Sequence, residues 1–74
     1  MQTIRIYTDY ITLGQLLKLK GIIRNGGDAK AFILDNDVAV NGEKEDRRGR
    51  KLYDGYEIKV NDQLFLIKSN VLPN

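Results

Sequence analysis

An Asn-Gly pair directly after an alternating apolar run is the feature that most restricts how this chain can fold. The run is 38–40, and Asn41 and Gly42 follow it. Asparagine and glycine tolerate the positive φ angles that a two-residue turn between antiparallel strands requires. The pattern therefore predicts a β-hairpin here, and with it a sheet in the second half of the chain.

Three further stretches predict strands. Apolar and charged residues alternate over 56–60, residues 61–62 form a turn, and residues 64–67 return the chain. Near the start, residues 3–7 also alternate and predict a short strand. Together with the hairpin, these stretches predict a small sheet of about four to five strands.

A first helix is predicted between the early strand and the hairpin. Thr12 is followed three positions later by Gln15, which is the pattern of a capping box. Apolar residues continue at helical spacing and are expected to face the core: Leu13, Leu16 and Leu17. With Gly21 as a C-terminal stop, the pattern predicts a helix over about residues 12–20.

A second helix is predicted over residues 28–34, after a turn at residues 24–27. Gly27 or Asp28 is expected to cap its start, and position 36 or 37 to end it. Its apolar stripe consists of Ala29, Phe32 and Ile33. Two short helices joined by a glycine-containing turn form a compact helical pair.

Composition excludes several kinds of chemistry. The 74 residues include no cysteine and no histidine. Without them, the usual zinc sites and the Ser/His and Cys/His nucleophile pairs are impossible. We therefore expect a protein that is not an enzyme and that uses no metal, no cofactor and no small-molecule substrate.

The length predicts a single domain over residues 1–70, with a frayed tail over 71–74, and we expect a monomer. No apolar stretch approaches the roughly 20 residues of a membrane span. The first residues lack the apolar run of a signal peptide, and the lack of cysteine fits a reducing compartment. These features predict a soluble, cytoplasmic protein without membrane contact.

Positive charge is unevenly distributed along the chain. The net charge is only +2, but nine of the twelve lysines and arginines lie between Lys18 and Lys51, and five lie within 44–51. Arginine matches phosphate oxygens with its planar fork, and lysine adds a mobile point charge. The basic run is therefore a candidate nucleic-acid contact. The alternative is a solvated loop whose charges pair with nearby acids: Glu43, Glu45 and Asp46.

Two smaller features add to this candidate surface. Residues 26–30 place two glycines and a lysine at a predicted helix start, where free N–H groups can hold a phosphate. The alternative is an ordinary turn between helices. Lys18, Lys20 and Arg24 either join one basic face or compensate the dipole of the first helix.

The aromatic residues do not form a stacking platform by spacing alone. Phe32 and Phe65 are expected in the core, and the four tyrosines can lie half-buried. Tyr53 is the one aromatic residue beside the basic run. It is therefore the candidate for stacking on a base.

The ordered set of these pieces resembles the small RNA-binding module named after ribosomal protein S-four. The pieces are residues 16–19, 26–30, 40–42 and 47–52, in that order. They look most like a stand-alone bacterial branch of tiny proteins, and the resemblance covers about residues 10–60. It implies an α+β fold with an αL motif, in which two short helices pack on a small, mostly antiparallel sheet.

In that family the helical pair and the adjacent strand and loop form one basic surface that faces RNA. By position, the resemblance places ten residues there: Thr12, Gln15, Lys18, Gly27, Lys30, Lys44, Arg47, Arg48, Arg50 and Lys51. We add Lys20 and Arg24 because they are cations near the first helix. One departure concerns Asp28, which stands where many members carry a basic residue. Contacts made by an arginine at that point do not transfer to this chain.

The sequence therefore predicts a small protein that binds structured RNA of the rRNA or tRNA type, with the ribosome as a candidate partner. Binding would use the helical pair and the loop over 44–51. The alternative is a protein–protein adaptor module that does not bind nucleic acid.

Overall fold

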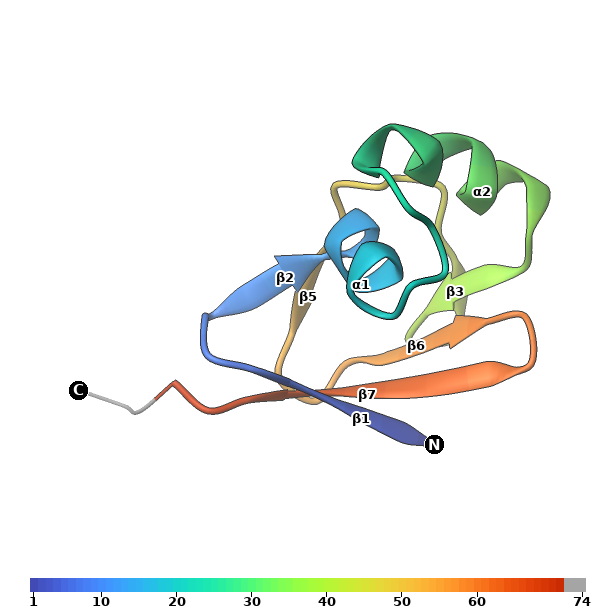
Figure 1. The fold of residues 1–74 in the computed structure, drawn as a ribbon. Helices are drawn as coiled ribbons and strands as arrows, with labels where there is room; N and C mark the ends of the chain where they lie inside the picture. Colours follow the sequence, from blue (N-terminus) through green and yellow to red (C-terminus); the bar gives the residue numbers. More distant parts are fainter. Residues whose placement is uncertain (72–74) are drawn as a thin grey trace.

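Two short helices cover one face of a five-stranded sheet in the computed structural model, which describes residues 1–71 (Figure 1). The helical segments are α1 (Leu13–Leu19), the 3-10 turn η1 (Gly26–Asp28) and α2 (Ala29–Asp35). The strands are β1 (Gln2–Ile6), β2 (Tyr10–Thr12), β3 (Val38–Val40), β4 (Glu43–Lys44), β5 (Lys51–Tyr53), β6 (Glu57–Val60) and β7 (Gln63–Ser69). The predicted α+β fold is confirmed, whereas residues 72–74 of the expected frayed tail lie outside the described residues.

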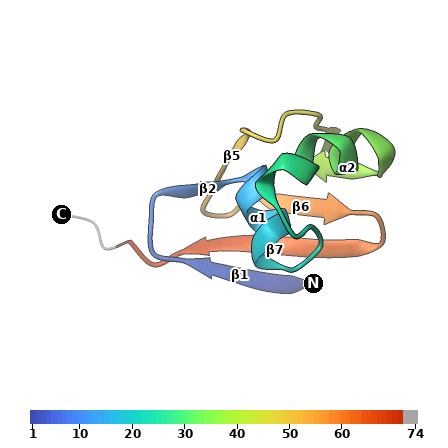
Figure 2. The same ribbon diagram turned by 45° about the horizontal axis from the view of Figure 1, so that its top comes forward.

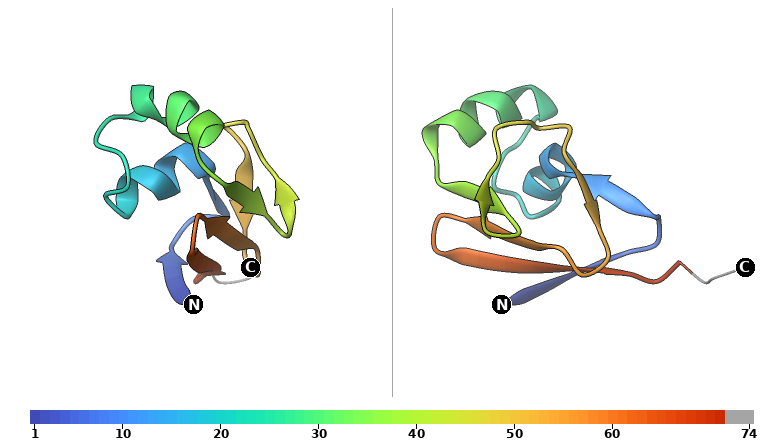
Figure 3. Two further views of the ribbon diagram at one scale, coloured as in Figure 1. Left: turned by 90° about the vertical axis from the view of Figure 1, so that its right-hand side faces the viewer. Right: turned by 180° about the vertical axis from the view of Figure 1, so that it is seen from behind.

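The main sheet has the strand order β1-β7-β6-β3-β4. Every neighbouring pair in it is antiparallel except β1 and β7, which run parallel. Strands β2 and β5 form a separate antiparallel ribbon beside α1 (Figure 2). The side view in Figure 3 shows both helices on the same side of the main sheet. The sheet therefore has one covered face and one face without helices.

The predicted hairpin is present between β3 and β4. Val40 pairs with Glu43, which leaves Asn41 and Gly42 as the two-residue loop. Both loop residues have positive φ angles, 53° for Asn41 and 84° for Gly42. This is the backbone that the right-handed twist of the two strands favours, and it explains the Asn-Gly pair.

Both predicted ends of α1 are confirmed. The Thr12 hydroxyl accepts a hydrogen bond from the Gln15 N–H at 3.2 Å, and the Gln15 side chain accepts one from the Thr12 N–H at 2.8 Å. After the helix, Gly21 has a φ of 70°, and the Ile22 N–H donates to the Leu17 carbonyl at 2.9 Å. The helix is therefore closed at both ends by the local sequence.

The start of α2 differs from the prediction. Asp28 is the first residue before the helix, but it has helical dihedral angles and its side chain makes no capping hydrogen bond. The 3-10 turn η1 leads directly into α2 instead, with the Ala29 N–H donating to the Gly26 carbonyl. The capping role expected for Gly27 or Asp28 is therefore wrong, whereas Asn36 does end the helix as expected.

The core lies between the helices and the inner face of the sheet. The leucines expected to face it are fully buried, as are Phe65, Ile58, Ile67 and Val38 of the strands. The buried apolar residues are Ile4, Ile6, Leu13, Leu16, Leu17, Ile23, Ala29, Ile33, Val38, Val40, Leu52, Ile58, Val60, Phe65 and Ile67. Phe32 is only partly buried and packs against the edge of this cluster. Among residues 1–71, no helix is long and apolar enough to cross a membrane.

Candidate nucleic-acid interface

The loop between β4 and β5, residues 45–50, is organised around the buried side chain of Glu45. Only 5% of Glu45 is exposed. Its carboxylate accepts hydrogen bonds from the guanidinium of Arg47 at 3.0 and 3.1 Å and from that of Arg50 at 2.9 Å. It also accepts from the backbone N–H groups of Asp46 and Arg47, both at 3.1 Å. One carboxylate therefore holds together the loop residues Asp46, Arg47 and Arg50.

These hydrogen bonds favour the ionised form of Glu45. Side-chain hydrogen bonds from Arg47 lower the pKa of this carboxyl from 4.5 to about 2, with further lowering by the Arg47 N–H and by Arg50. Burial acts in the opposite direction but is outweighed. Glu45 is therefore a carboxylate at any pH near neutrality, and the two arginines stay bound to it.

The same loop also covers the start of α1. The Leu13 N–H donates to the Arg50 carbonyl, and the Gly14 N–H donates to the Arg48 carbonyl, both at 2.9 Å. A Cβ atom on Gly14 would lie 3.4 Å from that Arg48 carbonyl and 3.6 Å from the Cβ atom of Ala29 in α2. The first free N–H groups of α1 are thus used inside the protein, and they fix the loop against the helical pair. The view from behind in Figure 3 shows the loop passing across α1.

A shallow groove lies where α1, η1 and the loop meet. Its lining consists of Thr12, Gly14, Gln15, Lys18, Gly26, Arg48 and Gly49. Lys18 and Arg48 supply positive charge, and none of the described residues that line the groove is acidic. Such a surface suits an anionic ligand.

Lys30 is a further exposed cation, in the first turn of α2. It follows Ala29, the residue that packs against Gly14 at the groove. Lys18, Lys30 and Arg48 are all exposed. Within residues 1–71, no ion pair includes any of these three cations. Their charge is therefore available to a partner.

The structure separates other predicted site residues from the groove. The ammonium group of Lys44 donates to the carbonyls of Ile33 and Asn36, at 3.2 and 2.7 Å, and so closes the end of α2. Lys20 lies at the far end of α1, with its nitrogen 5.9 Å from the centre of the Phe65 ring. Arg24 is exposed in the connection between α1 and η1.

The remaining predicted residues occupy intermediate positions. Gly27 is exposed in η1, directly beside the Gly26 of the groove. Arg47 keeps 72% of its side chain exposed despite its bond to Glu45, whereas Arg50 keeps 32%. Lys51 lies on β5, outside the loop, with its nitrogen 5.0 Å from the centre of the Tyr10 ring. Within residues 1–71, the alternative, in which the basic run pairs with nearby acids, thus holds for Arg47 and Arg50 and not for the other cations of the run.

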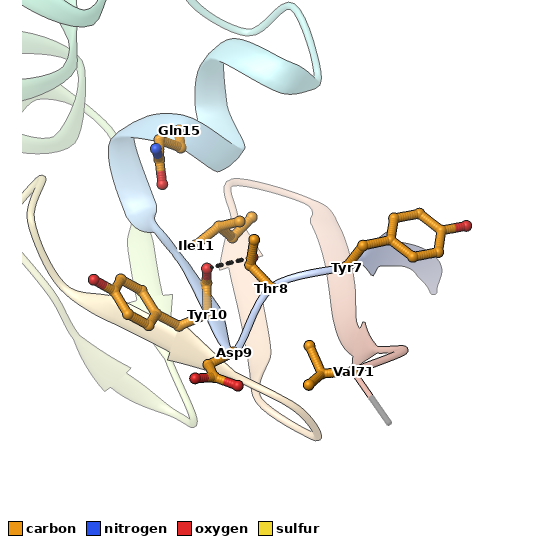
Figure 4. A pocket seen from close by; sticks show the side chains of 7 residues that line it. All are labelled: Tyr7, Thr8, Asp9, Tyr10, Ile11, Gln15 and Val71. Atoms are coloured by element: carbon orange, nitrogen blue, oxygen red, sulfur yellow. Dashed lines mark hydrogen bonds between the residues drawn. The ribbon is translucent and has the colours of Figure 1, made fainter. Parts of the chain in front are cut away.

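A second hollow lies at the turn between β1 and β2 (Figure 4). Its lining consists of Tyr7, Thr8, Asp9, Tyr10, Ile11, Gln15 and Val71. The Thr8 hydroxyl donates to the Tyr10 carbonyl at 2.8 Å, which shapes the turn. This hollow carries the acid Asp9 and, among the described residues, no lysine or arginine. It therefore does not suit a phosphate, and no group of three or more acids among residues 1–71 is placed to hold a metal ion.

Gly49 offers a direct test of how closely a ligand backbone approaches the loop. Its φ lies outside the positive range, and a Cβ atom there would meet nothing within 4 Å. We expect Gly49→Ala to leave the protein as stable as before, or more stable by about 0.5 kcal/mol, because alanine restricts the unfolded chain. Thermal unfolding measures this. A loss of stability would contradict the open space described here, and a selective loss of ligand affinity would show close approach.

The family and one relative of this chain agree with the described geometry. Residues 4–68 match the family model described as the S4 domain. The chain is also similar to a protein of Bacillus subtilis (strain 168) named "Probable ribosome maturation protein RlbA". The two sequences are 51% identical over 57 residues, which cover 77% of this chain and 80% of that protein. The family match runs from β1 to β7 and so includes both helices and the loop over 45–50.

Proposed function

This chain belongs to the S4 domain family, as its motifs indicate, and on that premise we propose that it binds structured RNA through the groove beside α1. The observation that carries the proposal is a set of exposed cations that form no ion pair within residues 1–71: Lys18 and Arg48 line a groove without acids, and Lys30 lies in the first turn of α2. We name this set the groove cations: Lys18, Lys30 and Arg48. Phosphate contacts from them would position the RNA, while its shape and 2′-hydroxyl groups would favour it over DNA.

Two further groups support the same surface. Thr12 and Gln15 line the groove with polar atoms, and Gly27 leaves the backbone of η1 open to close approach. Arg47 adds an exposed charge at the rim. Because the similar protein of Bacillus subtilis is named for ribosome maturation, we propose rRNA in the cytoplasm, on or near the ribosome, as the first candidate and tRNA as the second. The proposed role is binding without catalysis.

A matched pair of triple variants tests the proposal. The first, Lys18→Ala with Lys30→Ala and Arg48→Ala, removes the groove cations. The control, Arg5→Ala with Lys59→Ala and Lys68→Ala, removes three exposed cations from β1, β6 and β7, whose buried neighbours face the helices. Each variant changes the net charge from +2 to −1, since each loses three positive charges. Overall charge is thus held equal, while its position differs; the control also removes the exposed ion pair of Lys59 with Asp37, which contributes little.

We expect the groove variant to bind a labelled rRNA stem-loop about 10- to 100-fold more weakly, with a log–log salt slope shallower by roughly 2 to 3. The control variant is expected to change affinity by less than about threefold, since exposed charges on a distant face are screened. Titrations from about 50 to about 300 mM salt measure this slope. Equal losses in both variants, or no binding at low salt, would refute the proposal. Capture of a protein partner that survives nuclease treatment would instead favour an adaptor.

A further inference from the structure

Three tyrosines from different parts of the chain meet on the outer side of the β2–β5 ribbon. Tyr10 of β2 and Tyr53 of β5 are paired across the ribbon, with their ring centres 5.7 Å apart. The ring centre of Tyr56, just before β6, also lies 5.7 Å from that of Tyr53. Figure 4 shows the Tyr10 ring pointing to the opposite side from the Tyr7 ring. We call these three residues the tyrosine cluster.

The rings of the tyrosine cluster are not stacked on one another. Their planes are inclined at 51° and 68°, so neither pair is a parallel stack, and in the T-shaped pair the edge of one ring points towards the face of the other. Tyr10 is 37% and Tyr53 is 40% exposed. Among the described residues, none of the three hydroxyl groups forms a hydrogen bond. Rings that only filled the core would be more deeply covered.

Cations lie over the two outer rings of the described cluster and not over the central ring, Tyr53. The Lys51 nitrogen is 5.0 Å from the centre of Tyr10, and the Arg50 guanidinium carbon is 5.8 Å from the centre of Tyr56. No such contact within residues 1–71 involves Tyr53. Aromatic faces flanked by cations are the arrangement with which proteins stack on bases and hold the adjoining phosphates.

The tyrosine cluster is continuous with the groove. A shallow hollow beside it is lined by Arg47, Gly49, Arg50, Lys51, Tyr53 and Tyr56, and Gly49 also lines the groove. Along the ribbon, Thr12 pairs with Lys51 at the end nearest the groove. At the other end of the ribbon, Asp9 precedes Tyr10 in the sequence and Asp54 follows Tyr53. Charge therefore directs a nucleic-acid backbone from the groove as far as the tyrosines and no further.

We propose that the tyrosine cluster is a second contact site for RNA, at which Tyr53 stacks on an unpaired base next to the stem held in the groove. Lys51 and Arg50 hold the phosphates on either side of that base. This inference rests on the proposed function, because the stem in the groove brings the unpaired nucleotides to the ribbon. The RNA partner implied by this inference has a single-stranded segment beside a double-stranded one.

Two RNA hairpins with the same stem separate this inference from the proposed function. One carries three unpaired adenosines at its 5′ or 3′ end, and the other carries three abasic riboses there, with the same number of phosphates. We expect the protein to bind the adenosine hairpin about 5- to 100-fold more tightly for one of the two ends. Equal, salt-dependent binding of both would overturn this inference and leave the proposed function standing. Binding of neither at low salt would overturn both.

Variants of single tyrosines locate the effect. Tyr53→Leu is expected to abolish the preference for adenosine, Tyr53→Phe to retain it, and Tyr7→Leu, at an exposed ring outside the cluster, to leave it unchanged. Ring resonances of the wild-type tyrosines, followed by NMR, provide a measurement that does not depend on a variant's stability. They are expected to shift with the adenosine hairpin and not with the abasic one. Identical shifts with both hairpins, or an unchanged preference in Tyr53→Leu, would overturn the assignment.

Discussion

Replacing Leu16 by alanine is expected to lower the free energy of unfolding by about 2–5 kcal/mol. Leu16 is fully buried between α1 and the sheet, and alanine would leave a cavity there without weakening the helix itself. In a domain this small, that loss corresponds to a fall in Tm of at least about 10 °C. Thermal and urea unfolding, followed by circular dichroism, measure it. Because α1 carries Lys18 of the groove, RNA binding should be lost at the same lower temperature.

Leu19→Ala provides the matched comparison. Leu19 belongs to the same helix and has the same side chain, but it is 63% exposed. Its replacement is expected to change the free energy of unfolding by no more than about 0.5 kcal/mol. Similar losses in both variants would mean that α1 does not pack on the sheet through the face described here.

The sequence predicts the parts of the fold that local rules control. The Asn41–Gly42 turn, the capping box of Thr12 and the glycine end of α1 depend on residues within a few positions of one another. Each was therefore correctly predicted from spacing alone. The start of α2 was not, because the η1 turn continues into the helix and leaves no place for a side-chain cap.

Pairings between distant residues were not predictable in the same way. The parallel pairing of β1 with β7 joins the two ends of the chain, and the β2–β5 ribbon joins residues 10–12 to 51–53. Each ribbon strand has only three residues, which is too short for a clear alternating pattern. The tyrosine cluster depends on this ribbon, so spacing alone identified only Tyr53.

For the candidate site, the sequence indicated which charged residues to consider but not how they are arranged in space. Lys18, Lys30 and Arg48 were on the list of expected site residues; Lys18 and Arg48 line one groove, Lys30 is exposed on α2, and their contact with RNA stays a prediction. Lys44 instead donates hydrogen bonds to carbonyls at the end of α2, and these contacts join residues eight to eleven positions apart in the sequence. Three acids near the basic run were equally plausible partners, and the structure distinguishes Glu45 from Glu43 and Asp46 by its burial and by its ion pairs with two arginines.

Replacing Glu45 by glutamine is expected to lower the free energy of unfolding by about 2–3 kcal/mol at neutral pH. Glutamine retains the size of the side chain but loses the charge that two arginines and two backbone N–H groups bind. This loss of unfolding free energy lies at the lower end of the range for buried ion pairs, because the Arg47 side chain is mostly exposed and solvent screens its charge. RNA affinity should also fall, although the variant is more positive, because the loop no longer holds Arg48 beside α1.

Glu43→Gln is the control, since it makes the same chemical change on the exposed β4 strand. Its expected effect on the free energy of unfolding is no more than about 0.5 kcal/mol. Urea unfolding of both variants at pH 7 gives the comparison. A stable Glu45→Gln protein with unchanged RNA affinity would show that the loop does not depend on this carboxylate.

The pH dependence of stability identifies the charge of Glu45 as the cause. The pKa of Glu45 is about 2 in the folded protein, against the ordinary value of 4.5, so the unfolded chain binds more protons between these values. The stabilisation is therefore fully present above about pH 4.5 and is lost as the pH falls towards 2. The difference in unfolding free energy between wild type and Glu45→Gln should accordingly narrow from pH 4.5 to pH 2.5. A difference that stays constant over this range would assign the loss to shape and packing and not to the carboxylate charge.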